Sequence, residues 1–112
     1  MIHELRVYRC LPGRLPALTD RFERTTLGMW KRFGIRPVGF WTTVVGPSNL
    51  DLTYMLEWES MDERQRKWDA FRTDPDWLAA LAESERDGQI TERVTNTFLQ
   101  PTRFSPALVT GS

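Results

Sequence analysis

The chain passes from strand-like to helix-like patterning and back, and then repeats that order. In the strand-like segments apolar, β-branched and aromatic residues alternate with polar ones, whereas in the helix-like segments apolar residues recur every three or four positions. The strand-like segments are residues 2–10, 36–45, 52–59 and 90–99, and the helix-like segments are 14–33 and 61–87. This β-α-β-β-α-β order predicts an α+β, ferredoxin-like fold with a four-stranded antiparallel sheet and both helical segments on one face.

Capping residues indicate where the second helical segment begins and where it is interrupted. Ser60 and Glu63 are spaced as a capping box, in which the Ser hydroxyl accepts from the Glu amide and the carboxylate reaches back to the Ser amide. Pro75 interrupts the helical pattern, because proline is disfavoured inside a helix and welcome at its first position. We therefore expect a break there, with Asp74 or the preceding threonine as the N-cap of a further short helix.

The predicted strands carry large side chains on both faces of the sheet. Two helical segments cover only one face, so the other would be a large exposed apolar patch. A second sheet is the simplest cover for that patch. We therefore expect a homodimer of the dimeric α+β barrel type.

Composition and charge exclude several classes of protein. Fifteen basic and fifteen acidic residues leave no net charge, which argues against nucleic acid or an anionic membrane as a partner. Cys10 and His3 are the single residues of their types, which argues against an internal disulfide and a zinc site. With no phosphate-binding loop or haem-attachment motif, we expect no cofactor. The absence of a long apolar stretch or a signal-like start predicts a cytoplasmic protein.

The charges are unevenly distributed along the chain. Residues 1–50 hold eight Lys or Arg against three Asp or Glu, whereas residues 51–112 hold seven against twelve. Two halves of opposite sign complement each other, within a subunit or across a dimer. An acidic helix without such a role is the alternative.

Four segments, in this order and spacing, resemble the NIPSNAP family: HELRVYRCLPGRLPAL, GFWTTVVGPSNLDLTYMLEWESMDER, DPDW and LQPTRFSP. The resemblance runs from Ile2 to about Pro106. It implies a dimeric α+β barrel domain over residues 1–106 and leaves 107–112 as a flexible tail. For function, the resemblance points either to small-molecule chemistry or to a non-catalytic cellular role. The wider superfamily includes cofactor-independent enzymes and haem proteins, whereas eukaryotic family members are associated with mitochondria and vesicle traffic.

The family supplies no universal catalytic motif, so candidate residues come from their chemistry. His3 is the one side chain of the type that exchanges protons near neutral pH, and a structural histidine at a strand end is the alternative. Glu57 stands in the middle of a strand and becomes a usable base if it is buried. On a solvated face it would be an ordinary surface residue.

Glu4, Arg6 and Tyr8 fall on one face of the first strand because side chains alternate along a strand. A carboxylate, a guanidinium and a phenol in a row suit an acidic or phenolic ligand. Pairing with Glu92 or Arg93 on a neighbouring strand, as a structural network, is the alternative.

Five tryptophans are unusual in 112 residues, and tryptophan rarely finds a core large enough to bury it completely. Such rings line pockets or interfaces, where the indole N–H finds a partner. An aromatic core is the alternative. The aromatic residues to which these two alternatives apply are Trp41, Tyr54, Trp58, Trp68 and Trp77, with Phe71 beside them.

The function expected from these observations is a NIPSNAP-like homodimer that holds an apolar or aromatic small molecule in each subunit. As an enzyme it would perform cofactor-free acid–base chemistry of the isomerase, cyclase or lyase type, with His3 or Glu57 as the catalytic group. The substrate-binding residues would be Arg6, Trp41, Tyr54, Trp68 and Phe71. The alternative is a non-catalytic binding or protein-docking module.

Overall fold

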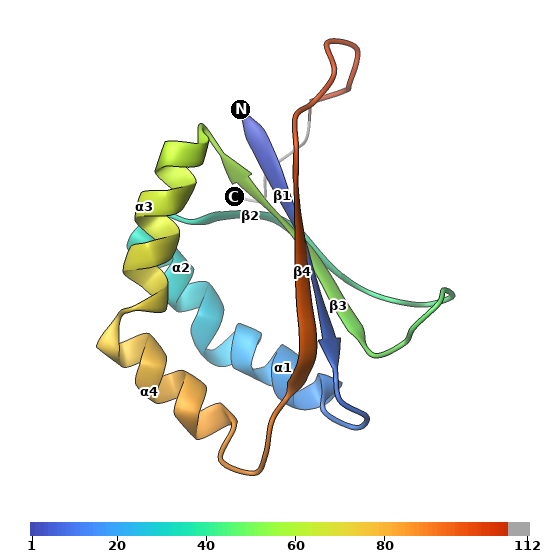
Figure 1. Cartoon of the computed structure of the whole chain (residues 1–112), viewed down its shortest axis with the longest axis vertical. Coiled ribbons are helices and arrows are strands. Elements are labelled where there is room, and N and C mark those ends of the chain that lie inside the picture. Colours follow the sequence, from blue (N-terminus) through green and yellow to red (C-terminus); the bar gives the residue numbers. More distant parts are fainter. Residues whose placement is uncertain (108–112) are drawn as a thin grey trace.

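The computed structural model describes residues 1–107 and confirms the predicted order of elements (Figure 1). The expected tail at 107–112 lies, apart from its first residue, outside them. The strands are β1 (Ile2–Cys10), β2 (Arg36–Thr42), β3 (Asp51–Trp58) and β4 (Thr91–Leu99). The helices are α1 (Leu15–Arg21), the π-helical turn η1 (Phe22–Thr26), α2 (Leu27–Phe33), α3 (Met61–Arg72) and α4 (Pro75–Ser84). Among the described residues, no helix is long and apolar enough to cross a membrane.

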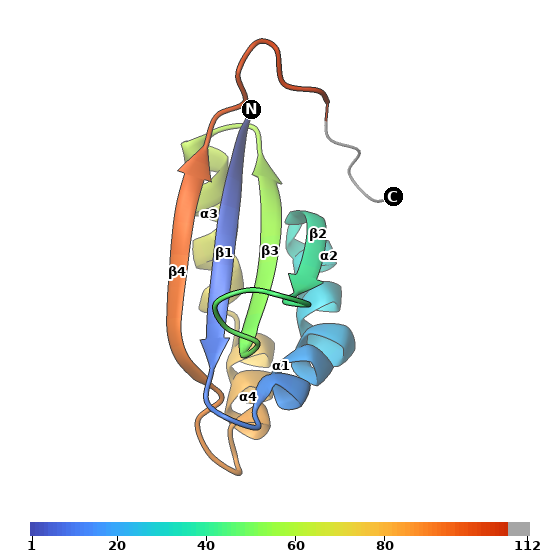
Figure 2. The same cartoon turned by 90° about the vertical axis from the view of Figure 1, so that its right-hand side faces the viewer.

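The four strands form one antiparallel sheet in the order β2-β3-β1-β4, with all helices on one face (Figure 2). We call this the helix-side face and the other the open face. The two faces differ in burial. Along β3, every second side chain points to the helix-side face and is buried under the helices. These buried side chains are Leu52, Tyr54, Leu56 and Trp58. β1 lies between β3 and β4, so its side chains have a neighbour on each side.

The first helical segment runs unbroken through η1 and ends where predicted. Gly34 follows α2 in the left-handed conformation, with φ +73°. The π-helical turn inserts one extra residue between α1 and α2. Trp30, eight residues after Phe22, is buried, and its ring packs edge-on against that of Phe22.

The capping box at the start of α3 is half confirmed. Ser60 Oγ accepts from the Glu63 amide at 3.1 Å, as predicted. The Glu63 carboxylate, however, accepts from the amide of Glu59 at 2.9 Å rather than from that of Ser60, and it is also held by Lys67 and Arg36. Burial would raise the pKa of Glu63, but these hydrogen bonds and charges outweigh it and lower the pKa to about 2.

The break between α3 and α4 is as expected. Asp74 is the N-cap of α4, and its carboxylate accepts from the amides of Asp76 and Trp77. Pro75 is the first helical residue, where its missing N–H costs nothing. α4 ends at Ser84, and the chain then turns towards β4 through Gly88.

The second strand is shorter than its sequence pattern predicts. β2 ends at Thr42, and residues 43–50 form a long loop before β3 begins. Val44 and Val45 have no strand opposite them and are almost fully exposed. The loop projects on the side of the open face, away from the helices (Figures 1 and 2).

The opposite charges of the two halves meet within one subunit. Ion pairs join arginines of the first half to carboxylates of the second, and one joins them in the reverse sense. They are Arg9–Asp51, Arg32–Asp74, Arg32–Asp76, Arg36–Glu63 and Glu4–Arg64. The uneven charge distribution thus contributes to docking the second half of the domain on the first.

Candidate functional site

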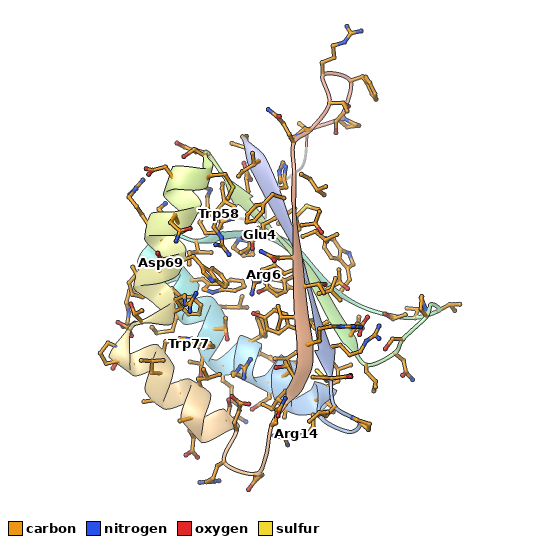
Figure 3. All side chains as sticks on the ribbon, viewed as in Figure 1. Glu4, Arg6, Arg14, Trp58, Asp69 and Trp77 are labelled. Atoms are coloured by element: carbon orange, nitrogen blue, oxygen red, sulfur yellow. The ribbon has the colours of Figure 1, made fainter. Side chains whose placement is uncertain are left out.

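A buried carboxylate, that of Glu4, lies on the helix-side face of β1 (Figure 3). It accepts five hydrogen bonds: from Arg6 Nη1 at 2.9 Å, Trp58 Nε1 at 3.1 Å, Asn96 Nδ2 at 3.0 Å, and Arg64 Nε and Nη2 at 3.2 and 3.1 Å. Burial would raise the pKa of Glu4, but the hydrogen bonds from Arg64 and Asn96 and the charge of Arg6 outweigh it and lower the pKa. Glu4 is therefore an ionised carboxylate whose accepting positions are all occupied by hydrogen bonds.

Arg6 links this carboxylate to two phenols. Its Nε donates to Tyr54 Oη at 2.7 Å, and its Nη2 donates to Tyr8 Oη at 3.2 Å. The two phenol oxygens are 3.1 Å apart. Burial would lower the pKa of Arg6, but the neighbouring Tyr8, Tyr54 and Glu4 raise it above its ordinary value, and burial raises the pKa of Tyr54 well above its own.

The remaining members come from α3 and β4. Arg64 reaches down from α3 to Glu4, and Asn96 stands next to Arg6 in the register of β1 and β4. The guanidinium carbons of Arg6 and Arg64 lie 4.5 and 5.3 Å from the centroid of the Trp68 ring, distances typical of cation–π contacts. The Glu4 cluster consists of Glu4, Arg6, Tyr8, Tyr54, Arg64 and Asn96. With two guanidinium groups and one carboxylate, it keeps a residual positive charge.

An accessible apolar surface borders the Glu4 cluster. β4 is an edge strand, and its helix-side residues Val94, Asn96 and Phe98 lie opposite Tyr8, Arg6 and Glu4 respectively. All three are exposed, although they face the side on which the helices lie. We call Val94, Asn96 and Phe98 the β4 strip. A molecule lying on it would touch the partly exposed Tyr8 at one edge.

The structure divides the seven predicted site residues between the two faces of the sheet. Arg6, Tyr54, Trp68 and Phe71 lie on the helix side, whereas His3, Glu57 and Trp41 lie on the open face. The expectation of one pocket that joins His3 or Glu57 to the helix-side aromatic residues is therefore corrected. Alternation along β1 and β3 decides this, because His3 and Arg6 differ by an odd number of residues, as do Glu57 and Tyr54.

On the open face, His3 and Glu57 stand directly opposite each other in the register of β1 and β3. His3 is buried and lines a hollow of about 330 Å³, together with Met55, Leu99, Gln100, Pro101, Thr102 and Ser105. Glu57 is half-buried, so it is neither the buried base nor the fully solvated surface residue considered from the sequence. Trp41 is 51% exposed, in contrast to the other predicted aromatic residues.

The helix-side aromatic residues mainly form the core. Trp58, Trp68, Phe71 and Trp77 are buried together with Trp30; Figure 3 labels Trp58 and Trp77 among them. The Phe71 and Trp77 rings lie 4.6 Å apart, which leaves no space for a ligand between them. The aromatic-core alternative therefore describes these residues. Two of them also contact the Glu4 cluster: Trp58 donates to Glu4, and Trp68 lies beside Arg6 and Arg64.

The network around Glu4 has other partners than the predicted Glu92 or Arg93. Sequence reasoning placed Glu4, Arg6 and Tyr8 on one face correctly, but it missed Arg64 and Asn96. The pairing register of β4 decides which of its residues meets Arg6, and no sequence pattern specified that register. One signal for Arg64 was available in the sequence: it lies one helical turn before Trp68, so the two side chains share a face of α3.

Comparisons with known proteins agree with this architecture. The model of the NIPSNAP family matches residues 3–106. The chain is similar to the structure of a NIPSNAP family protein of unknown function from Agrobacterium tumefaciens, with a TM-score of 0.82, 29% identity, and coverage of 97% of this chain and 94% of that one. An uncharacterised NIPSNAP domain protein from Burkholderia xenovorans gives a TM-score of 0.82 at 24% identity, covering 96% and 100%.

More distant similarity extends to the fold alone. A putative antibiotic biosynthesis monooxygenase from Nitrosomonas europaea superposes with a TM-score of 0.61 at 7% identity, covering 90% of this chain and 98% of that one. No curated protein matches the chain.

Proposed function

The chain belongs to the NIPSNAP family, and we propose that it is a homodimer in which each subunit binds an aromatic or apolar small molecule on its helix-side face. The ligand would lie on the β4 strip and reach the Glu4 cluster at Tyr8. One observation carries the proposal: the exposed apolar side chains of Val94 and Phe98 lie alongside buried and partly buried polar groups that are fixed by hydrogen bonds. Binding sites commonly combine an apolar wall with a few oriented polar groups.

The proposal is limited to binding. His3 and Glu57, the residues with suitable acid–base chemistry, lie across the sheet from the β4 strip. On the helix side, the Glu4 carboxylate already accepts five hydrogen bonds and has no free position from which to remove a proton. The groups that remain there are donors, which hold and orient a ligand.

The first test uses N-phenyl-1-naphthylamine, a neutral dye that fluoresces in apolar sites. We expect one site per subunit with micromolar affinity. Val94→Arg should abolish the fluorescence increase, because it places a charge on the β4 strip. Leu78→Arg is the matched control, since Leu78 on α4 is 48% exposed and Val94 is 43% exposed. Absence of binding, or equal loss in both variants, would refute a ligand site on the β4 strip and favour a docking module.

The homodimer is proposed from the open face. Leu5 and Val7 of the central strand β1 and Met55 of β3 are only partly buried, and Trp41 and Leu99 beside them are exposed. A central strand whose apolar side chains are incompletely covered favours a partner surface. A second copy that packs its own open face here would bury more than about 1,200 Å² in total, the size of a stable interface.

Sedimentation equilibrium tests the dimer directly. We expect wild-type protein to be dimeric at micromolar concentration and Met55→Arg to shift it to monomer, because a charge in the centre of an apolar interface is costly to bury. Leu78→Arg, on the helical layer, should remain dimeric. Wild-type protein that sediments as a monomer would exclude the face-to-face dimer.

A further inference from the structure

The two phenols of the Glu4 cluster have a defined hydrogen-bond direction. Tyr54 is completely buried, and its oxygen already accepts from Arg6 Nε. Its own proton needs an acceptor, and among the described residues the one within hydrogen-bond distance is Tyr8 Oη, at 3.1 Å. Tyr54 therefore donates to Tyr8, since a buried hydroxyl proton without an acceptor is costly.

Tyr8 consequently receives two hydrogen bonds, from Tyr54 Oη and from Arg6 Nη2. A phenol oxygen has one proton to donate and accepts at its lone pairs. With its accepting positions in use, Tyr8 has only its proton left, and within residues 1–107 that proton has no acceptor. Tyr8 is also partly exposed and stands beside Val94 of the β4 strip. Tyr8 thus carries a free donor and borders the β4 strip.

The charge around Tyr8 favours an anionic acceptor. Arg6 and Arg64 carry two positive charges, and Glu4 neutralises one of them. Donation from Arg6 and Tyr54 also polarises the Tyr8 hydroxyl and strengthens it as a donor, since chained hydrogen bonds reinforce one another. A carboxylate oxygen would satisfy the free proton and the unbalanced charge together.

We propose that Tyr8 is a ligand-binding residue whose hydroxyl, aligned by Tyr54 and Arg6, binds the carboxylate of an aromatic acid whose ring lies on the β4 strip. This inference rests on the proposed function and specifies its ligand class. Tyr54 and Arg6 are positioning residues, because they act on the ligand through Tyr8. The free Tyr8 proton requires a hydrogen-bond acceptor on the ligand. The residual positive charge of the Glu4 cluster favours an acceptor that is negatively charged.

The experiment measures displacement of N-phenyl-1-naphthylamine by three ligands that share one ring system: 2-naphthoate, 2-naphthamide and 2-naphthylmethylammonium. We expect naphthoate to displace the dye at the lowest concentration and the ammonium compound at the highest. Tyr8→Phe should weaken naphthoate about 10-fold or more, the effect of losing one hydrogen bond to a charged acceptor. The same variant should weaken the dye and the ammonium compound much less than naphthoate, because neither offers a carboxylate to Tyr8.

A spectroscopic readout separates contact from indirect effects. The chain has two tyrosines, so labelling with ¹³Cζ-tyrosine gives two NMR signals, and Tyr54→Phe assigns them. Naphthoate should move the Tyr8 signal most. If the dye binds but the three ligands compete equally, or the Tyr8 signal does not move, this inference is wrong and the binding site stands. If the dye itself does not bind the β4 strip, both proposals fail.

Discussion

Glu4→Gln is expected to lower the free energy of unfolding by about 3–5 kcal/mol, the range for removing one partner of a buried ion pair. The amide has one accepting oxygen in place of two, and its NH₂ group would face N–H donors. Arg6 and Arg64, only 10% and 14% exposed, would then share a site without a neutralising charge. Urea denaturation followed by tryptophan fluorescence measures the change.

Asp62→Asn is the matched control, because Asp62 also pairs with an arginine of α3, Arg66, but at the surface. Its removal should cost less than about 1 kcal/mol, as is usual for exposed pairs.

The acid dependence of stability gives a second check on Glu4→Gln. The pKa of Glu4 is lower in the folded state than its ordinary value, so its contribution is complete above that ordinary value and is lost as the pH falls through the folded one. Glu4→Gln should therefore flatten the acid limb of the stability curve, and an unchanged limb would contradict this role.

Trp30→Ala should cost a similar amount, about 3–5 kcal/mol, through an unfilled cavity rather than a lost charge. Trp30 is 1% exposed, and its ring contacts Phe22, Phe40, Tyr54, Trp68 and Phe71. These neighbours come from both the sheet and the helical layer, so no single element can collapse into the space. Thermal and urea unfolding would both report the loss.

Trp30→Phe separates the ring from its indole N–H. Trp30 Nε1 is buried and has no hydrogen-bond partner among the described residues. Removing it therefore sacrifices no hydrogen bond, and we expect Trp30→Phe to cost much less than Trp30→Ala. Trp58→Phe provides the contrast, because its Nε1 donates to Glu4 at 3.1 Å. If Trp30→Phe proved more costly than Trp58→Phe, the assignment of these two indole groups would be wrong.

Local sequence patterns predicted the elements well because local physics determines them. Ser60 and Asp74 define helix starts by accepting from backbone amides only a few residues away, and Pro75 favours the first helical position through its own fixed geometry. Predictions failed where a distant partner or a change in helical geometry decided the outcome. Helical periodicity did not reveal the π-helical turn, and Val44 and Val45 have strand-like character but no strand opposite them.

The candidate site was less predictable than the fold. Alternation correctly placed Glu4, Arg6 and Tyr8 together, and it equally placed His3 on the opposite face from Arg6. Which face the helices cover is a tertiary property, and the Trp excess did not reveal it. The partner from β4, Asn96, depends on the strand register, and Arg64 depends on how α3 crosses the sheet. Both are set by packing across the whole domain.

The central position of β1 has a consequence for how the domain is made on the ribosome. β1, the first strand of the domain to be synthesised, pairs with β3 and with the last strand, β4; His3 and Leu99 are partners in this pairing. During translation β1 therefore lacks one neighbour, and Glu4 lacks Asn96, until β4 has left the exit tunnel. Pairing between such distant segments carries a large loop-closure entropy and slows folding. We expect folding to be completed only after β4 emerges, and truncated nascent chains to depend on chaperones until then.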